Sequence, residues 1–187
     1  MISNRLHRRL FNLAGVLAVV GLMAYALYEQ YVVGLEACPL CIFQRVALIT
    51  LGVVFLVAAL HGPVGRGARG YAGLGAVVAL VGAGISAWHV HIQNLPDDAV
   101  PSCGPGLAYM FDAFSVPQAI KMVFTGSGEC HAVNWKFLGL SMPGWVLIWF
   151  VLLGALIVYA NWSPLAERRT QRARAENGVR PQFPTAN

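Results

Sequence analysis

Four long apolar runs constrain this chain more than any other feature. They cover residues 11–28, 42–60, 71–88 and 143–160. Each is close to the roughly 20 residues that a helix needs to cross the hydrocarbon core of a bilayer. A mean hydropathy of +0.61, with 57% hydrophobic residues, excludes an ordinary soluble domain. The predicted fold is therefore all-α, a bundle of four transmembrane helices that forms a single membrane domain over residues 1–162.

The distribution of charge predicts how these spans are oriented. Four spans place both ends of the chain and the turn at residues 61–70 on one side, which then holds ten of the 13 Arg and Lys residues. The opposite side holds six of the eight acidic residues. Because cytoplasmic segments carry the excess of positive charge, we expect both termini in the cytoplasm. The loops at residues 29–41 and 89–142 then lie outside.

The same distribution of charge bears on the partners of the protein. The net charge of +5 could suggest nucleic acid, but most of the Arg residues are divided among three inside segments, which the membrane rule already explains. We therefore expect no nucleic-acid partner. The tail at residues 163–187 carries five Arg residues, and we expect it to be disordered or to bind lipid headgroups in the cytoplasm.

The first outer loop ends in a Cys-x-x-Cys motif, Cys38 to Cys41, at the mouth of the second span. Pro39 suits the first position of a helix, so Cys38 is the expected N-cap, where the helix dipole favours a thiolate. Arg45 lies one turn beyond Cys41 on the same face and can hold negative charge there. Such a motif can also be half of a zinc site or a structural disulfide. Its place at the membrane edge favours redox chemistry, and we expect no metal.

A second pair of cysteines, Cys103 and Cys130, lies in the other outer loop. A disulfide between Cys38 and Cys41 would close a very small loop and would stabilise the fold little. The second pair would close a long loop that an outside protein could approach. Together they suggest a relay, in which a partner thiol attacks the loop disulfide and electrons pass by thiol–disulfide exchange to the membrane pair. A lipid-soluble quinone suits the final acceptor.

The second outer loop also contains one helical pattern. Ser115 and Gln118 resemble a capping box, and apolar residues then recur at helical spacing up to Phe124. This pattern predicts a short helix that lies in the membrane interface. A small helix packed on the protein itself is nearly as compatible with it.

Three segments together resemble the disulfide bond formation protein B family. They are the run Cys38-Pro-Leu-Cys-Ile-Phe-Gln-Arg45, the outer-loop Cys103 and Cys130, and the run Trp135-Lys-Phe-Leu-Gly-Leu-Ser-Met-Pro143-Gly-Trp145. The resemblance covers about residues 10–162. It implies a four-helix quinone reductase of the bacterial inner membrane, with its cysteines facing the periplasm. Its partner would be a periplasmic thioredoxin-like dithiol oxidase of the DsbA type, and its acceptor ubiquinone or menaquinone from the quinone pool.

The resemblance also implies a role for each cysteine. Cys103 corresponds to the sulfur that the thiolate of the partner attacks. Cys130 would then be released and would attack Cys38. This attack would free Cys41 as a thiolate beside the quinone.

Other residues are assigned to the quinone site by the same resemblance. Arg45 corresponds to an arginine of that site, and His89 to a histidine near the quinone ring. Gln44, Met142 and Trp145 are weaker candidates, because Gln44 could simply face a neighbouring helix and the other two could simply lie at the membrane interface.

Two alternatives remain open from the sequence. A vitamin K epoxide reductase-like protein is also a four-helix thiol enzyme linked to a quinone. In such a protein, however, the membrane dithiol usually lies late in the chain, whereas here it precedes the second span. The other alternative is a membrane scaffold without enzymatic activity, held by two structural disulfides.

Overall fold

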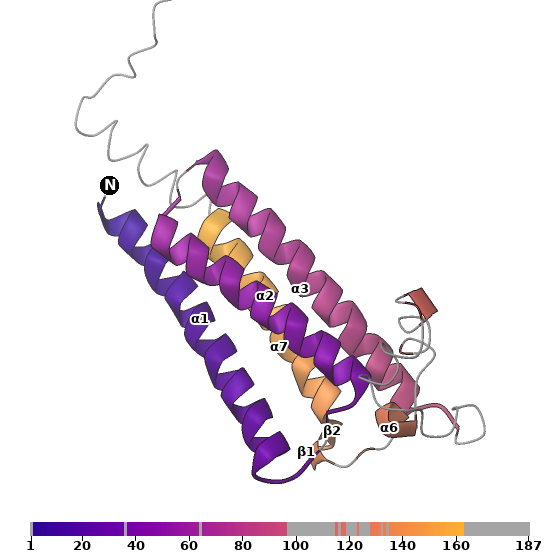
Figure 1. Ribbon diagram of the computed structural model, residues 1–187. Coiled ribbons are helices and arrows are strands. Elements are labelled where there is room, and N and C mark those ends of the chain that lie inside the picture. Colours follow the sequence, from indigo (N-terminus) through magenta and orange to yellow (C-terminus); the bar gives the residue numbers. More distant parts are fainter. Residues whose placement is uncertain are drawn as a thin grey trace, which may run out of the picture.

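The computed structural model of the chain describes residues 2–35, 37–63, 65–96 and 135–162, and residues 115, 117, 118, 123, 128–131 and 133 between them. Its long helices are α1 (Ile2–Tyr31), α2 (Pro39–His61), α3 (Arg66–Gln93) and α7 (Met142–Trp162). They run side by side as one bundle (Figure 1). Each contains a segment long and apolar enough to cross a membrane. The predicted four-helix membrane bundle is therefore confirmed.

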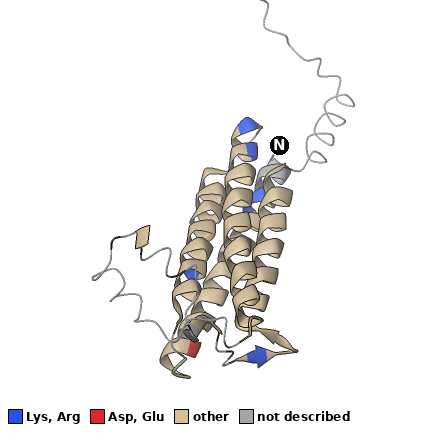
Figure 2. Cartoon of the chain, turned by 90° about the vertical axis from the view of Figure 1, so that its right-hand side faces the viewer, with Lys and Arg blue, Asp and Glu red and all other residues tan. Residues whose placement is uncertain are grey.

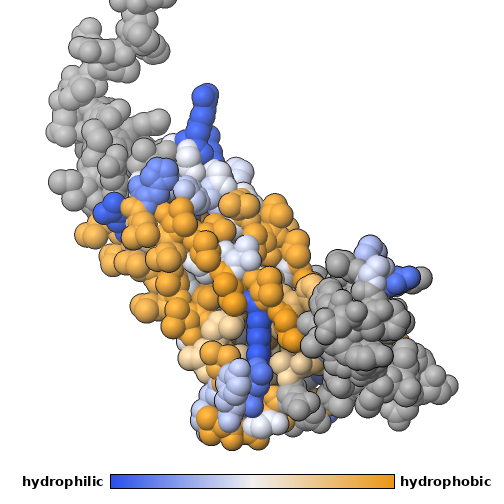
Figure 3. Space-filling view, viewed as in Figure 1, coloured by the Kyte–Doolittle hydropathy of each residue, from blue (hydrophilic) through white to orange (hydrophobic). Residues whose placement is uncertain are grey.

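The surface of the bundle suits lipid rather than water. Large apolar side chains are exposed on all four long helices, among them Leu17, Val53, Leu80 and Val151. Figure 3 shows hydrophobic side chains over much of the length of the bundle. Figure 2 shows that most of the described Lys and Arg residues lie at the end of the bundle where the chain begins. These features agree with a multi-pass membrane protein.

The helices pack in the order α1, α2, α3 and α7 around the bundle, and α7 closes the ring against α1. The contact between α3 and α7 depends on small residues. A Cβ atom on Gly75 would lie 2.3 Å from Ile157, and one on Gly154 would lie 2.9 Å from the Cβ of Ala79. Small residues therefore let these two helix backbones approach closely, as in other membrane bundles.

Two helices extend beyond the apolar runs that predicted them. Helix α1 begins at Ile2 rather than near residue 11, and α3 ends at Gln93 rather than near residue 88. Hydropathy marks the part of a helix that lies in lipid, and a helix can continue into the headgroup layer. At the start of α1, Arg8 donates to the Pro63 carbonyl at 3.3 Å, which ties this extension to the end of α2.

The start of α2 agrees with the sequence. Cys38 is its N-cap, and its sulfur accepts a hydrogen bond from the Cys41 backbone N–H at 3.4 Å. Pro39 occupies the first helical position. At the other end the Gly62 backbone, at φ 57°, donates its N–H to the Ala58 carbonyl at 3.0 Å. Local capping therefore fixes where α2 begins and ends.

A small hairpin just before α7 was not predicted. Strands β1 (Lys136–Phe137) and β2 (Leu140–Ser141) pair antiparallel. Leu138 at φ 50° and Gly139 at φ 81° form the turn between them, and positive φ at both central residues is typical of a type I′ hairpin turn. Trp145 of α7 donates its indole N–H to the Phe137 carbonyl at 3.0 Å. The hairpin is therefore held on the first turn of α7.

Only part of the second outer loop is described. The Ser115 backbone N–H donates to Gln118 Oε1 at 3.4 Å, which is one of the two hydrogen bonds of a capping box. Most of the predicted interfacial helix lies outside the described residues, as do Cys103 and the tail at residues 163–187. Helix α6 (Gly128–His131) is described and carries Cys130.

Candidate functional site

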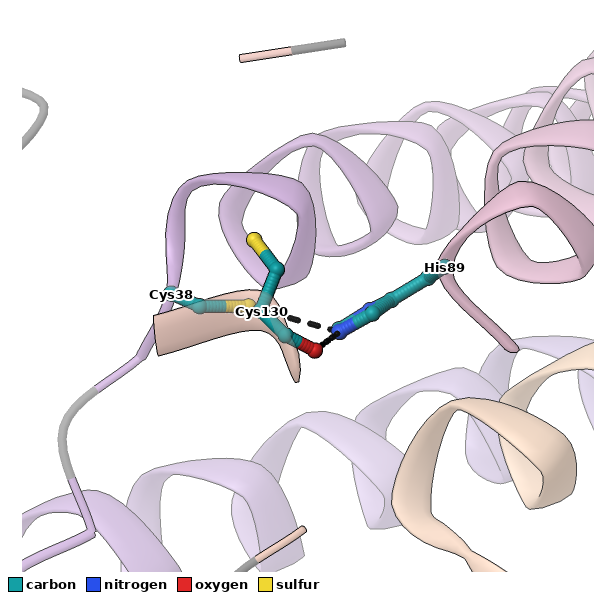
Figure 4. Close-up of side chains that lie close together, drawn as sticks. All are labelled: Cys38, His89 and Cys130. Carbon is teal, nitrogen blue, oxygen red and sulfur yellow. Dashed lines mark hydrogen bonds between the residues drawn. The ribbon is translucent and has the colours of Figure 1, made fainter. Parts of the chain in front are cut away.

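Described residues from the two loops that carry the cysteines meet at one end of the bundle. There the start of α2, the last turns of α3 and the short helix α6 pack around a cluster formed by Cys38, Leu40, Ile92, Val123 and Cys130. Figure 4 shows side chains from all three elements close together. Residues that are far apart in the sequence therefore form one buried site.

Three sulfur atoms lie within this site. The Cys38 thiol donates to Cys41 Sγ at 2.8 Å. Cys38 Sγ, Cys130 Sγ and a ring nitrogen of His89 all lie within 4.8 Å of one another. Cys38 and Cys130 are only 6% and 1% exposed, whereas Cys41 is less deeply buried. The structure thus brings one cysteine of the second loop against the membrane-edge pair.

The surroundings of Cys38 keep its proton on the sulfur. The hydrogen bond with Cys130, followed by that with Cys41 and by burial, raises the pKa of the Cys38 thiol above its ordinary value. A thiol with a raised pKa is a poor nucleophile at neutral pH but a good hydrogen-bond donor. Cys38 therefore suits the role of a sulfur that is attacked while it is in a disulfide. It does not suit the role of an attacking thiolate.

His89 connects the second loop to this group. It is 2% exposed, and its Nε2 lies 3.1 Å from the Cys130 carbonyl oxygen and 3.8 Å from Cys38 Sγ. Because a carbonyl oxygen only accepts, Nε2 carries the proton and donates to Cys130. Nδ1 is then free to accept from the side-chain N–H of Gln44, 3.2 Å away. Gln44 of α2 thus sets the tautomer with which His89 holds Cys130.

A second histidine, which the sequence did not single out, also fixes α6. His131 Nδ1 lies 2.9 Å from the Ile92 carbonyl oxygen and donates to it. Ile92 belongs to the last turn of α3, close to His89. Helix α6 is therefore attached to α3 through two consecutive residues, Cys130 and His131.

Arg45 lies on another side of α2, against α1. Its guanidinium donates to Gln30 Oε1 and, at 3.1 Å, to the Ala26 carbonyl. It also acts electrostatically on Cys41. The C-terminal end of a helix carries a partial negative charge, so the Arg45 guanidinium is well placed between this end of α1 and the cysteine. Gln30 was not predicted as a partner of Arg45, because residue 30 lies in the predicted loop at residues 29–41.

Comparison with known proteins decides the family. The family model described as disulfide bond formation protein DsbB matches residues 8–160. The chain belongs to the DsbB family. A protein named disulfide bond formation protein B from Methylococcus capsulatus is 51% identical over 156 residues, covering 83% of this chain and 94% of that protein. Proteins of the same name from Nitrosococcus oceani and Xanthomonas campestris are 52% and 47% identical, over 74% and 84% of this chain and 82% and 92% of their own lengths.

Membership of the DsbB family assigns the chain to disulfide bond formation, a thiol redox activity. This confirms the family resemblance seen in the sequence. A thiol redox activity requires cysteines that can exchange partners, and the cysteine cluster is the candidate for that site.

In this DsbB family member, the structure gives no contact between the cysteine cluster and the remaining candidates among the described residues. Trp145 makes its hydrogen bond and a ring contact of 5.9 Å with Phe137 of the hairpin rather than with a cysteine. Met142 is half-buried at the first position of α7. Cys103 lies outside the described residues. The roles of these three residues stay predictions.

Proposed function

We propose that this DsbB family member is a protein-dithiol:quinone oxidoreductase that reoxidises a periplasmic thioredoxin-like dithiol oxidase of the DsbA type. The observation that carries the proposal is the position of Cys130, whose sulfur lies within 4.8 Å of Cys38 Sγ. A scaffold with two structural disulfides would have no need to bring its two pairs together. A relay between the pairs requires this proximity.

The relay consists of thiol–disulfide exchanges in which sulfur bonds and electrons balance. A thiolate of the partner attacks Cys103 of a Cys103–Cys130 disulfide, so that a mixed disulfide forms and Cys130 leaves as a thiolate. Cys130 then attacks Cys38 of a Cys38–Cys41 disulfide and releases Cys41 as a thiolate.

Two resolving steps return the outer pair to its oxidised form. The second thiol of the partner displaces Cys103, and the partner departs with its own disulfide. Cys103 then attacks Cys130, which releases Cys38 as a thiol and restores the Cys103–Cys130 disulfide. Two electrons have now passed from the partner to Cys38 and Cys41.

The chain's own residues assist these steps. His89 Nε2–H holds the Cys130 carbonyl, which keeps the attacking sulfur beside Cys38. The raised pKa of Cys38 means that this sulfur takes up a proton once it is released, and a protonated thiol does not attack the disulfide again. The Cys38 thiol then donates to Cys41 Sγ, which stabilises negative charge on Cys41.

The residues around Cys41 fit a quinone as the electron acceptor. Cys41 and Arg45 are one turn apart on α2, and exposed apolar side chains such as Val46 and Ile49 continue from them along the membrane surface. A quinone bound there would take up two electrons from the reduced pair, with one proton from the Cys38 thiol and one from solvent. Arg45, fixed by Gln30 and the Ala26 carbonyl, would hold negative charge next to Cys41.

The proposed location is the bacterial inner membrane, with the termini in the cytoplasm and the cysteines facing the periplasm. Most of the described basic residues lie at the end of the bundle where the chain begins (Figure 2), and the cysteine cluster lies at the start of α2 and the end of α3, which supports this orientation. Membrane-impermeant maleimide added to intact spheroplasts should label the reduced cysteines. Labelling only after the membrane is opened would reverse the orientation.

The test of function uses the purified full-length protein, a reduced DsbA-type oxidase and ubiquinone or menaquinone under anaerobic conditions. Loss of quinone absorbance and formation of the oxidised partner should proceed in equal amounts. The Cys41→Ser variant should insert into the membrane but should not reduce quinone. In the Cys130→Ala variant Cys103 is a free thiol, which should attack the disulfide of the oxidised partner and give a mixed disulfide that alkylation traps. Normal turnover by Cys41→Ser would exclude the relay, and the absence of any mixed disulfide would favour a scaffold.

A further inference from the structure

The cysteine cluster contains a set of donor atoms that thiol exchange alone does not require. Cys38 and Cys130 contribute sulfurs and His89 contributes a ring nitrogen, all within 4.8 Å of one another and all buried. Cys41 Sγ, 2.8 Å from Cys38 Sγ, is a possible fourth donor. Figure 4 shows how Cys38, His89 and Cys130 lie together although they belong to different elements.

We propose that the fully reduced protein binds one thiophilic divalent cation, such as Zn²⁺ or Cd²⁺, through Cys38, Cys41, Cys130 and His89, and that this ion blocks the thiol relay. Three cysteines and one histidine are one of the usual ligand sets of tetrahedral zinc. The ion would inhibit the reduced form of the protein at this site. It does not make the metal a resident cofactor.

The distances permit such a site after small side-chain rotations. Zinc lies about 2.3 Å from sulfur and about 2.0 Å from nitrogen, so the donors of a tetrahedral site are roughly 3.5–3.8 Å apart. The donor atoms of Cys38, Cys130 and His89 lie within 4.8 Å of one another, and Cys41 Sγ lies 2.8 Å from Cys38 Sγ. Movements of about 1 Å would bring the first three donors to the required spacing, and rotation of the adjacent Cys41 side chain would supply the fourth.

Charge and burial also favour the ion. Binding would displace the protons that remain on the cysteine thiols without any transfer of electrons, leaving three thiolates around a divalent cation. The net charge of this centre would be negative by one unit, and the Arg45 guanidinium acts electrostatically on Cys41. Any disulfide among these cysteines removes two ligands. Binding would therefore depend on the redox state of the protein.

Gln44 is positioned to support His89 as a ligand. A histidine that binds metal through Nε2 carries its proton on Nδ1 and usually donates it to an oxygen. The Gln44 amide lies 3.2 Å from Nδ1. If the amide is turned over, its oxygen replaces its nitrogen and can accept this proton. Nε2 then gives up the Cys130 carbonyl and becomes available to the ion.

The ion would occupy the sulfurs that must exchange partners. Cys130 bound to metal cannot attack, and Cys38 bound to metal cannot form the disulfide between the two loops. The relay would stop until the metal is removed or the cysteines are reoxidised. Soft metal ions would thus inhibit this enzyme when its quinone supply is exhausted and its cysteines are reduced.

The test uses Co²⁺ and then Zn²⁺ as probes of the full-length Cys103→Ser protein, purified in detergent, reduced and kept anaerobic. The Cys103 substitution leaves the three proposed sulfur ligands as its only cysteines. One equivalent of Co²⁺ should produce the intense visible absorption of tetrahedral thiolate coordination, and Zn²⁺ should abolish it. Reoxidation of Cys38 and Cys41 should prevent binding.

Variants identify the ligands. The His89→Ala and Cys130→Ala variants should each bind Co²⁺ at least about tenfold more weakly, and the visible spectrum of the bound Co²⁺ should change. Gln44→Leu should weaken it about 10–100-fold, the usual effect of losing an outer partner of a metal-bound histidine, and Gln44→Glu should restore it. His91→Ala is the matched control, because His91 lies on the exposed side of α3 and its loss should change nothing.

Two results would overturn the proposal. One is the absence of tetrahedral Co²⁺ absorption at stoichiometric metal in the reduced protein. The other is binding that is unchanged in both His89→Ala and Cys130→Ala, which would mean that Cys38 and Cys41 alone hold the ion. Circular dichroism of each variant separates a lost ligand from a lost fold.

Discussion

The side-chain amide of Gln44 lies 3.2 Å from Nδ1 of His89, and this contact determines which ring nitrogen faces Cys130. With Nδ1 occupied as an acceptor, Nε2 carries the proton and donates to the Cys130 carbonyl at 3.1 Å. The orientation of a side chain on α2 therefore controls how α6 is held against α3. The step that depends on this contact is the attack of Cys130 on Cys38.

Replacement of Gln44 by leucine should slow that step. The variant removes the donor to Nδ1 and leaves His89 without a fixed tautomer, and a buried hydrogen bond of this kind is worth about 1 kcal/mol. We expect the exchange between the two loops to slow about fivefold to tenfold, as measured by quenched-flow alkylation. Formation of the mixed disulfide between Cys103 and the partner should be unchanged.

The control for Gln44→Leu is Thr50→Val, which also removes a hydrogen-bonding group from α2, at an exposed position. It should have no effect on exchange. If Gln44→Leu instead raised only the apparent KM for quinone, Gln44 would belong to the quinone site, as the family resemblance suggested.

Replacement of Arg45 by alanine should raise the apparent KM for quinone. The guanidinium is the positive charge placed between α1 and Cys41, and its loss removes a charged hydrogen bond worth roughly 1.5–3 kcal/mol. We expect a rise of at least tenfold in steady-state assays. Gln30→Leu removes only a partner of Arg45 and should give a smaller rise. An unchanged KM in Arg45→Ala would remove Arg45 from the site.

The raised pKa of Cys38 predicts the pH dependence of its alkylation. Alkylation requires the thiolate, so a raised pKa moves the midpoint of the rate above about 8.5, the ordinary value for cysteine. Cys130 is the largest cause of the shift, so Cys130→Ala should move the midpoint downward. Mass spectrometry after reaction with iodoacetamide at a series of pH values would measure the midpoint of Cys38 alkylation in the unaltered protein and in the Cys130→Ala variant. A midpoint below 8.5 in the reduced protein would contradict the assignment of Cys38 as the protonated thiol.

The same shift has a consequence for stability. The folded state favours the neutral Cys38 thiol, so its contribution is fully present below the ordinary pKa and is lost as pH rises beyond it. The reduced protein should therefore unfold more easily at pH 10 than at pH 7. The Cys38→Ala variant should show a smaller difference between the two pH values in thermal unfolding.

The sequence predicted the parts of this molecule that depend on local chemistry. Apolar runs gave the four spans, and Pro39 after Cys38 gave the start of α2. The environment of His89 was not predictable in this way, because it combines Gln44 of α2 with the backbone of Cys130 in α6. The hairpin was not predictable because each of its strands has only two residues. Leu138, unlike Asn or Gly, is also not a residue type that indicates a positive φ. Residue 30 was assigned to a loop because hydropathy does not show where α1 ends.

Asn12 and Asn161 should stabilise the end of the bundle far from the cysteines. Each amide donates to the other's oxygen, at 3.3 and 3.0 Å, and both residues are almost fully buried. Asn12→Leu alone leaves the Asn161 amide without this partner, which should cost about 1–3 kcal/mol. The double Leu variant should lose less than the sum of the two single variants, because no unpaired amide remains. Thermal unfolding in detergent would measure these differences, and additive losses would show that the two amides act independently. Turnover of the folded fraction should be unchanged, because neither residue contacts the cysteine cluster in the described structure.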